Sequence, residues 1–468
     1  MYLNCHSFHS LRYGTIPLPE LIEQAVAHGL KAMALTDINT VTGIYEFIKA
    51  CTDKRIKPLV GMEFRYNNRL HFIGLAKNNE GLAEMNRFLT MHNFDGTPLP
   101  LAAPAFENVT VIYPVENIPT VLAPYEYIGI KPGQLLLLYH VQWSSYLYKM
   151  VVLQPVTFLT KKEYSLHKVL RAIDTNKILS KLTEEDYCKP SEFMLPPHVL
   201  LEKFKEYPQI LENTQQVIDG CNFKFDFKPL RNRKFYTRDK KSDMSLLSSL
   251  ARQGVEKKYG NNPEAKARVE KELKIIEKLE FSGYFLITWD IIRYSNSMGF
   301  MHIGRGSGAN SIVSYCLGIT AICPLELDLY FERFLNLNRK SPPDFDIDWS
   351  WKERDTILEY IFNRYGYDHV AFCGTNVEFK YRSIFREVGK VFGLPKEELD
   401  ALAINRCSCT TKILWWRWYI NMGRCWRNTQ TSGVCTPAGL SFLKSRLPTL
   451  PHWRCRQKVF PLFSLICM

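Results

Sequence analysis

The sequence predicts an α/β fold in two parts: a sheet with helices packed on it, and then a helical region that carries one acidic strand. In the first part, short apolar runs alternate with amphipathic helical patterns up to residue 156. This alternation is typical of a parallel sheet covered by helices, either open or closed as a barrel. The second part is indicated by a glycine-rich turn and an alternating acidic strand between residues 302 and 349.

Residues 18–29 place apolar side chains at i, i+3 and i+4 spacing, which predicts an amphipathic helix. The run 31–36 predicts a buried strand, 40–51 a helix and 57–66 another strand. Further strands are predicted at 71–75, 110–115, 134–139 and 150–156. Because ligands of such sheets gather at the carboxyl ends of the strands, we expect the functional residues of this domain there.

A polar, basic segment at 228–241 predicts the end of the first domain. Two helices are predicted next, at 242–259 and 264–279, and the second carries a stripe of Val269, Leu273 and Ile276 that is typical of a core. The predicted parts of the chain are 1–228, 229–376, 377–403 and 404–468.

The chain has 468 residues and a formal net charge of +13, which is unevenly distributed. The 65 residues from Ile404 onward hold ten of the 60 Lys+Arg and no acidic residue, so the rest has 50 basic against 47 acidic residues, a net of +3. Global charge therefore says little about function. Since neither a membrane span nor a secretory signal is found, we expect a cytoplasmic protein with reduced cysteines.

The segment 302–311 (HIGRGSGANS) has three glycines within five residues. These free the backbone so that successive N–H groups can face an anion. Arg305 adds a planar cation, Ser307 a hydroxyl donor, and a helix expected to start near Asn310 adds its positive N-terminal end. A triphosphate suits this set, although a plain glycine-rich turn is the alternative. The segment lacks the G-x-x-x-x-G-K-[ST] pattern, which disfavours an ATPase.

The segment 343–349 (PDFDIDW) alternates acidic and apolar residues. In an extended strand, Asp344, Asp346 and Asp348 lie on one face and the apolar residues on the other. Such an acidic face can hold one or two hard cations, as two-metal phosphoryl transfer requires. The alternative is a half-buried strand with a solvated acidic side. Three like charges on one face repel each other unless cations or arginines offset them, which weakens that alternative.

Four motifs in this order resemble the palm of the bacterial C-family DNA polymerases, the alpha subunits of DNA polymerase III. They are GYFLITWDII (283–292), GRGSGANS (304–311), FERFLN (331–336) and PDFDIDW (343–349). The resemblance covers roughly residues 1–403. It implies a PHP-type, barrel-like phosphoesterase fold followed by part of a polymerase-beta-like nucleotidyltransferase palm and the start of a thumb.

The resemblance implies DNA-directed DNA polymerase activity with Asp344 and Asp346 as catalytic, Mg²⁺-binding carboxylates, while Asp348 resembles a secondary position. The implied nucleotide-binding residues are Arg305, Gly306, Ser307 and Arg333. The implied partners are primer–template DNA, deoxynucleoside triphosphates and other replicase subunits such as the sliding clamp, with no membrane.

The N-terminal region departs from the metal-binding pattern of PHP domains. Four ligands of the pattern are matched and at least four are replaced. The matched ligands are His6, Asp37, Glu63 and His71. The replacements are Asn4, Tyr13, Ile38 and the 157–159 segment (TFL). Because isoleucine and phenylalanine cannot donate an electron pair to a metal, we expect a structural PHP domain without metal or exonuclease activity.

The tail 404–468 is expected to be aberrant. It clusters six of the 13 cysteines and five of the nine tryptophans and shows no helical or strand period. A change of reading frame near residue 404 is preferred over a basic nucleic-acid-binding arm. The family's third catalytic aspartate is not found after Asp346, so the chain is expected to be an incomplete and inactive copy. A PHP phosphoesterase or 3′–5′ exonuclease, and a non-catalytic DNA- or subunit-binding remnant, remain the alternatives.

Overall fold

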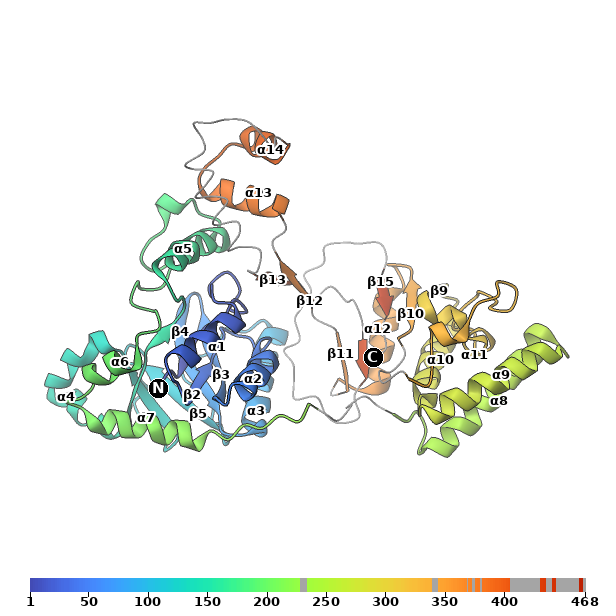
Figure 1. The fold of residues 1–468 in the computed structure, drawn as a ribbon, viewed down its shortest axis with the longest axis horizontal. Coiled ribbons are helices and arrows are strands. Elements are labelled where there is room, and N and C mark those ends of the chain that lie inside the picture. The colour runs from blue at the N-terminus through green and yellow to red at the C-terminus, as the bar shows by residue number, and fades with distance from the viewer. Residues whose placement is uncertain are drawn as a thin grey trace. The chain divides into compact units, whose positions relative to one another are not determined.

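The computed structural model describes residues 1–227, 234–338, 344–367, 369–372, 375–378, 381–404, 430–434, 440–442 and 463–465. The chain divides into two compact units (Figure 1). Unit 1 comprises Met1–Phe227 and Asn376–Gly433, and unit 2 comprises Lys228–Thr375 and Val434–Met468. The four-part division predicted from the sequence stays a prediction.

Unit 1 is built on a six-stranded sheet in the order β2-β3-β4-β5-β6-β7. Its strands are β2 (Ala32–Leu35), β3 (Lys57–Tyr66), β4 (Arg69–Ala76), β5 (Val109–Pro114), β6 (Glu126–Ile130) and β7 (Met150–Val152). The pairs β2/β3, β5/β6 and β6/β7 are parallel, whereas β3/β4 and β4/β5 are antiparallel. The predicted sheet is therefore mixed rather than parallel, because a tight turn joins β3 directly to β4.

Two short strands connect the edges of this sheet. β1 (Asn4–Cys5) pairs in parallel with β8 (Pro155–Val156), which follows β7. On its other side, Tyr2 and Cys5 accept hydrogen bonds from the Ala34 and Thr36 N–H groups, which belong to or follow β2. The strands thereby form a barrel-like arrangement, which confirms the expected fold class.

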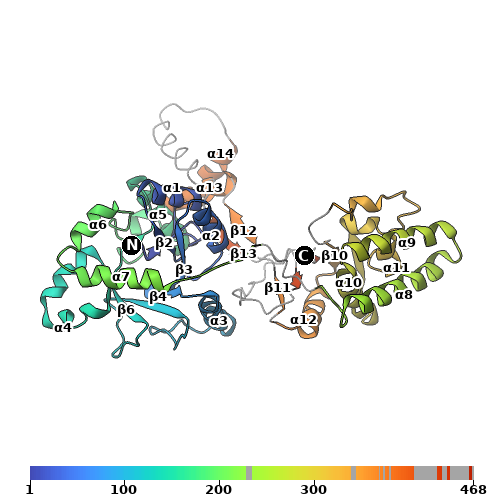
Figure 2. The ribbon, with the colours of Figure 1, turned by 60° about the horizontal axis from the view of Figure 1, so that its bottom comes forward.

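Helices pack on the sheet, with α2 against β3, α3 against β4 and α7 against β7 (Figure 2). The helices of unit 1 are α1 (Leu18–Ala27), α2 (Ile44–Asp53), α3 (Asn79–Asp95), α4 (Val141–Ser144), α5 (Lys161–Thr175), α6 (Pro197–Lys203), α7 (Pro208–Gly220), α13 (Tyr381–Val391) and α14 (Lys396–Ile404). Ile384, Val388 and Val391 of α13 join a buried cluster with residues of α5. The strands β12 (Thr375–Glu378) and β13 (Gln430–Val434) pair with each other.

The predicted strand at 134–139 is wrong. This segment belongs to the 3₁₀ helix η1 (Pro132–Tyr139), whose Leu136 is 74% exposed. The Gln134 side chain accepts a hydrogen bond from the Lys131 N–H and thereby caps the turn. The missing strand is β6, a few residues upstream. Shorter 3₁₀ turns follow at η2 (Leu147–Lys149) and η3 (Leu179–Lys181).

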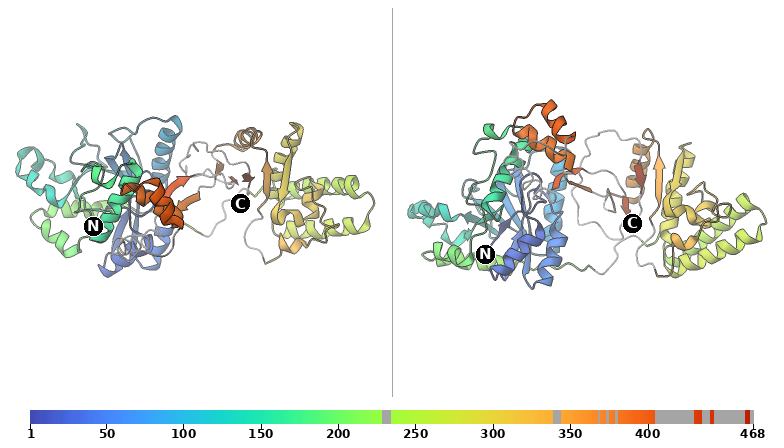
Figure 3. Two further views of the ribbon diagram at one scale, coloured as in Figure 1. Left: turned by 90° about the horizontal axis from the view of Figure 1, so that it is seen from above. Right: turned by 45° about the horizontal axis from the view of Figure 1, so that its top comes forward.

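Unit 2 is mainly helical, with α8 and α9 side by side (Figure 3). Its helices are α8 (Lys240–Tyr259), α9 (Pro263–Lys278), α10 (Ser282–Ser297), α11 (Ile312–Cys316) and α12 (Arg354–Tyr365), with 3₁₀ turns η4 (Gly306–Asn310) and η5 (Phe331–Arg333). The strands β9 (His302–Arg305) and β10 (Asp346–Trp349) form an antiparallel pair. β11 (Val370–Phe372) pairs with β14 (Leu440–Phe442), and β15 (Phe463–Leu465) pairs with β10.

A buried carboxylate joins three segments of unit 2. Asp290 of α10 accepts hydrogen bonds from the hydroxyls of Tyr236, Tyr360 and Tyr365 at 2.9–3.0 Å and from Arg293 Nη2 at 2.7 Å. Burial alone would raise the pKa of Asp290, but these hydrogen bonds outweigh it and lower the pKa. α10 and α12 are thereby fixed around one ionised group.

No described helix is both long and apolar enough to cross a membrane. The interpretation of 404–468 as an aberrant tail concerns residues that lie mostly outside the described part of the chain.

Candidate nucleotide and metal site

The acidic strand β10 alternates as the sequence predicts. Asp344, Asp346 and Asp348 are half-buried, while Phe345, Ile347 and Trp349 are buried in the core of unit 2. Trp349 Nε1 also donates a hydrogen bond to Ser295 Oγ at 2.7 Å. The apolar face fixes the strand to α10, and the carboxylates share the other face.

Strand β9 brings the glycine-rich turn to this acidic face. In the antiparallel register Arg305 lies opposite Asp346, and Gly304 lies opposite Ile347. A Cβ atom on Gly304 would come within 2.1 Å of the Ile319 carbonyl oxygen. Glycine is therefore required here for β9 to lie close to the segment behind it.

The turn itself lies against a carboxylate. Gly306 has φ +70°, and a Cβ there would lie 2.6 Å from Asp346 Oδ2. Ser307 follows within η4 and is half-buried, and η4 contacts η5, where Arg333 is exposed. Phe334 follows Arg333 and packs on Phe345 with ring centroids 5.2 Å apart. The structure thus gathers the predicted nucleotide-binding segments around the base of β10.

One carboxylate of this face pairs with an arginine of the turn. Arg305 Nε donates to Asp348 Oδ2 at 2.7 Å, while the buried Asp348 Oδ1 has no hydrogen-bond partner among the described residues. Burial raises the pKa of Asp346, and Asp344 and Asp348 raise it further, against an opposing effect of Arg305. A carboxylate with a raised pKa beside an aspartate oxygen that lacks a hydrogen-bond partner among the described residues suits a hard divalent cation.

One predicted contribution to anion binding is wrong. The helix after the turn, α11, does not offer its N-terminal N–H groups to a ligand. The buried carboxylate of Glu272 on α9 accepts hydrogen bonds from Ile312 N and Val313 N at 3.2 Å and from Ser311 Oγ at 2.8 Å. Any anion at the turn must therefore be held by η4 and the nearby arginines.

A second group of predicted residues lies at the carboxyl ends of strands in unit 1. His6 and Thr157 directly follow β1 and β8, and Asp37 is the second residue after β2, as expected for this fold. His6 bridges two of the elements: its Nδ1 lies 3.0 Å from Thr157 Oγ1 and its Nε2 lies 2.9 Å from Glu63 Oε2. The side chains of His6, Asp37, Glu63 and Thr157 are all buried.

Glu63 already has a cationic partner. Arg65 Nε donates to Glu63 Oε1 at 2.6 Å, and Asn4 Nδ2 donates to Oε2 at 2.9 Å. Burial alone would raise the pKa of Glu63, but Arg65 and then His6 outweigh it, so that the pKa lies well below its ordinary range. The guanidinium also stacks over the Tyr13 ring, 4.4 Å from its centroid.

Comparison with known proteins places the two units in one family. Residues 3–109 match the PHP domain, and residues 245–414 match the bacterial DNA polymerase III alpha NTPase domain. An error-prone DNA polymerase of Symbiobacterium thermophilum is 29% identical over 453 residues, which cover 86% of this chain and 42% of that protein. The DNA polymerase III alpha subunits of Streptococcus pyogenes serotype M1 and Bacillus subtilis (strain 168) are 31% and 29% identical.

The chain belongs to the bacterial DNA polymerase III alpha family. The matches to the two alpha subunits each cover 86% of this chain but only 38% and 39% of those proteins. The chain thus spans about two fifths of the length of these curated relatives.

The PHP residues of this alpha-subunit homologue do not fit a metal. Both oxygens of Glu63 are held by donors, and Asp37 accepts hydrogen bonds from Ser7 N, Ser7 Oγ and Ser10 Oγ at 2.6–2.7 Å. His71 Nδ1 lies 2.9 Å from the Pro100 carbonyl oxygen. Within the described ranges, no group of three or more His, Cys, Asp or Glu is placed to hold a metal ion.

The palm residues fit Mg²⁺ better, because Mg²⁺ commonly takes one or two carboxylates and completes its shell with substrate phosphates and water. Asp344 and Asp346 supply such a pair. Sequence reasoning missed two residues of the sites, Arg65 and Glu272. Arg65 lies two positions after Glu63 on the same strand face, and Glu272 is an acidic residue on the apolar stripe of α9; both patterns were readable.

Proposed function

We propose that this chain forms the PHP domain and the nucleotide-binding part of the palm of a template-directed DNA polymerase. The observation that carries the proposal is the β9–β10 pair, which places a carboxylate face directly beside a glycine turn with Arg305 and Ser307. The proposed substrates are deoxynucleoside triphosphates and primer–template DNA, and the proposed compartment is the cytoplasm. Other replicase subunits, such as a sliding clamp, are proposed partners of the longer proteins that it resembles.

Two groups of residues have different proposed roles, one in binding the metal and one in binding phosphate. Asp344 and Asp346 would hold Mg²⁺, which when bound lowers the pKa of the attacking 3′-hydroxyl and holds the pyrophosphate leaving group. Gly306 brings the backbone of the turn against Asp346, so that phosphates on the turn meet the carboxylates. Arg305 is oriented by Asp348, and its guanidinium is half exposed, so it can donate to a phosphate.

The PHP domain is proposed to be structural. A phosphoesterase or exonuclease needs metal ligands with open electron pairs, and Arg65 occupies the carboxylate that would provide one.

The test of the nucleotide site is Mg²⁺-dependent binding of a deoxynucleoside triphosphate, measured by isothermal titration. Asp346→Asn should weaken binding about tenfold or more, since a charge-assisted contact contributes about 1.5–3 kcal/mol. Asp355→Asn is the matched control, because Asp355 is an exposed aspartate of the same unit that pairs with its neighbour Arg354. Equal weakening in both variants, or no Mg²⁺-dependent binding by the wild type, would refute the proposal.

A further inference from the structure

Helix α9 carries a buried carboxylate beneath the glycine turn. Glu272 is fully buried, and its two oxygens accept from Ser311 Oγ and from the N–H groups of Ile312 and Val313. These are the first residues after η4, the 3₁₀ turn that contains Ser307. A single side chain of α9 thus fixes the downstream end of the turn.

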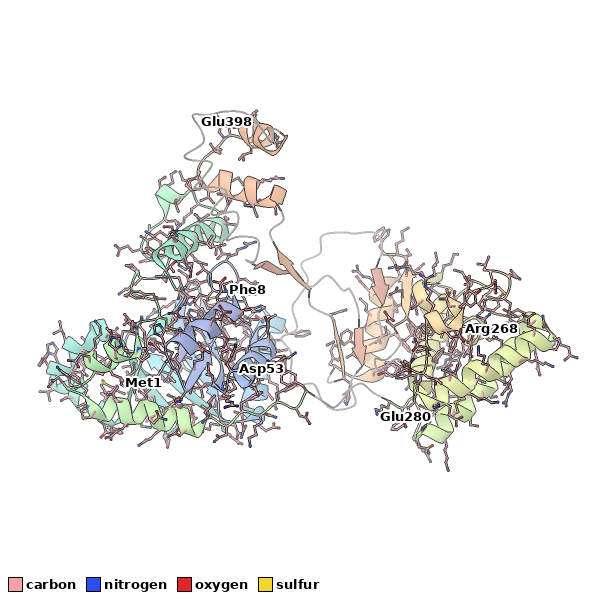
Figure 4. All side chains as sticks on the ribbon, viewed as in Figure 1. Met1, Phe8, Asp53, Arg268, Glu280 and Glu398 are labelled. Atoms are coloured by element: carbon pink, nitrogen blue, oxygen red, sulfur yellow. The ribbon has the colours of Figure 1, made fainter. Side chains whose placement is uncertain are left out.

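The neighbouring turn of the same helix carries the partner of this carboxylate. Arg268 Nε lies 3.4 Å from Glu272 Oε1, and its Nη2 donates to the Asn310 carbonyl at 3.2 Å and to the Leu329 carbonyl. Figure 4 shows the Arg268 side chain among the helices of unit 2. Asn310 ends η4, and Leu329 lies two residues before η5, which contains Arg333. The guanidinium therefore joins the two segments that carry Ser307 and Arg333.

We propose that Arg268 and Glu272 are positioning residues that hold the turn with Ser307 and the turn with Arg333 at the spacing needed to grip one triphosphate. This inference rests on the proposed function. Arg268 and Glu272 bind backbone groups and Ser311 Oγ at the ends of the two segments, so the pair acts through the segments it holds. Both turns are short 3₁₀ segments, of five and three residues, and a phosphate site gains affinity when its backbone is fixed before binding.

A salt bridge elsewhere on α9 provides the matched control. Glu270 lies two residues from Glu272 on the exposed side of the helix and pairs with Arg252 of α8 at 2.8 Å. Glu270→Ala removes a carboxylate, an ion pair and a helix-favouring side chain from α9, but it leaves the turns untouched. Any effect specific to Glu272 or Arg268 thus reports on the two turns rather than on the stability of α9.

The experiment measures hydrogen exchange of the full 468-residue chain by mass spectrometry, together with dTTP·Mg²⁺ binding. Arg268→Met and Glu272→Ala should each speed exchange about tenfold in peptides covering 306–316 and should weaken dTTP binding about tenfold. Arg268→Met should do the same for peptides covering 327–335. Glu272→Gln should restore both readouts in part, because its one amide oxygen can accept from Ser311 Oγ and Val313 N while its –NH2 group faces the Ile312 N–H. Glu270→Ala should change neither.

The inference is overturned if both turns exchange at the wild-type rate in Arg268→Met, or if Glu272→Ala speeds exchange equally throughout α8 and α10, which would be general unfolding. It is also overturned if the turns loosen while dTTP affinity stays unchanged. A wild-type chain that binds no dTTP would instead refute the proposed function. In that case the exchange data alone decide whether the pair fixes the turns.

Discussion

Replacing Arg65 tests whether the PHP domain of this chain depends on an internal cation. In Arg65→Met, Glu63 keeps its full burial and loses its guanidinium partner. His6 and Asn4 remain as hydrogen-bond partners, but neither provides a permanent charge. Removing one member of a buried ion pair costs about 3–5 kcal/mol, which is a large part of the stability of an ordinary domain.

The assay is urea unfolding followed by hydrogen exchange of peptides from β2 and β3, which reports on unit 1 alone. Arg12→Met is the matched control: Arg12 pairs with Asp174 at 3.3 Å with both side chains about one third exposed, so its loss should cost less than about 1 kcal/mol. The double variant Glu63→Gln with Arg65→Met removes both charges and should recover much of the loss.

The pH dependence has a definite sign. Because the pKa of Glu63 is lower in the folded state, the stability it contributes is present above its ordinary pKa of 4.5 and is lost as the pH falls below that value. Zn²⁺ or Mn²⁺ should not shift the unfolding of unit 1, since Arg65 already neutralises the carboxylate. A cost below about 1 kcal/mol for Arg65→Met, or a metal-dependent gain of unit 1 stability, would refute the reasoning.

Three further changes have distinct outcomes. Gly306→Ala should weaken Mg²⁺-dependent dTTP binding, because the new Cβ displaces Asp346. Gly299 has a similar positive φ but no atom near its Cβ position, so Gly299→Ala should only lower stability by about 1 kcal/mol. Equal dTTP affinity of the two variants would contradict this. Asp290→Asn should destabilise unit 2 by about 3 kcal/mol in urea unfolding. An unchanged unfolding midpoint would contradict the inference that Asp290 holds α10 and α12 together. Burial raises the pKa of Glu272 to about 7, so the stability of the wild type should fall by up to about 3 kcal/mol as the pH rises from about 4.5 to 7. Glu272→Gln should abolish this pH dependence of stability, and a pH dependence that persists in the variant would contradict the assignment to Glu272.

Local patterns were sufficient to predict the acidic strand and most of the sheet. In PDFDIDW the apolar residues Phe345, Ile347 and Trp349 must be buried, so the alternation places the three aspartates on the opposite face of the strand. The strand at 57–66 has the predicted bounds. The segment 134–139 was mispredicted because it is as apolar as a buried strand. Its conformation is decided by Pro132 and by a side-chain cap, which an apolar-run criterion does not register.

The parts that the sequence left open depend on contacts between distant segments. That Glu272 caps α11 follows from the packing of α9 against α11, across 39 positions of the chain between Glu272 and Ser311. The expected free helix N-terminus was a sound inference for an isolated helix, but a neighbouring carboxylate had already satisfied its donors. Likewise, the lost PHP ligands were visible in the sequence, and so was the spacing of Arg65 from Glu63, but only the structure shows that the two side chains pair.

The two carboxylate clusters of this chain show how surroundings determine the use of one functional group. Glu63 is fully buried, which by itself would raise its pKa, yet the pKa is lowered because Arg65 on the same strand, and then His6, favour the ionised carboxylate more strongly than burial disfavours it. Asp346 is less buried, and its pKa is raised, first by its burial and then by Asp344 and Asp348, against the opposing effect of Arg305, which itself pairs with Asp348. A divalent cation brought to Glu63 must displace a bonded guanidinium, whereas one brought to Asp346 relieves repulsion that is already present. Metal affinity in this chain should therefore reside in unit 2.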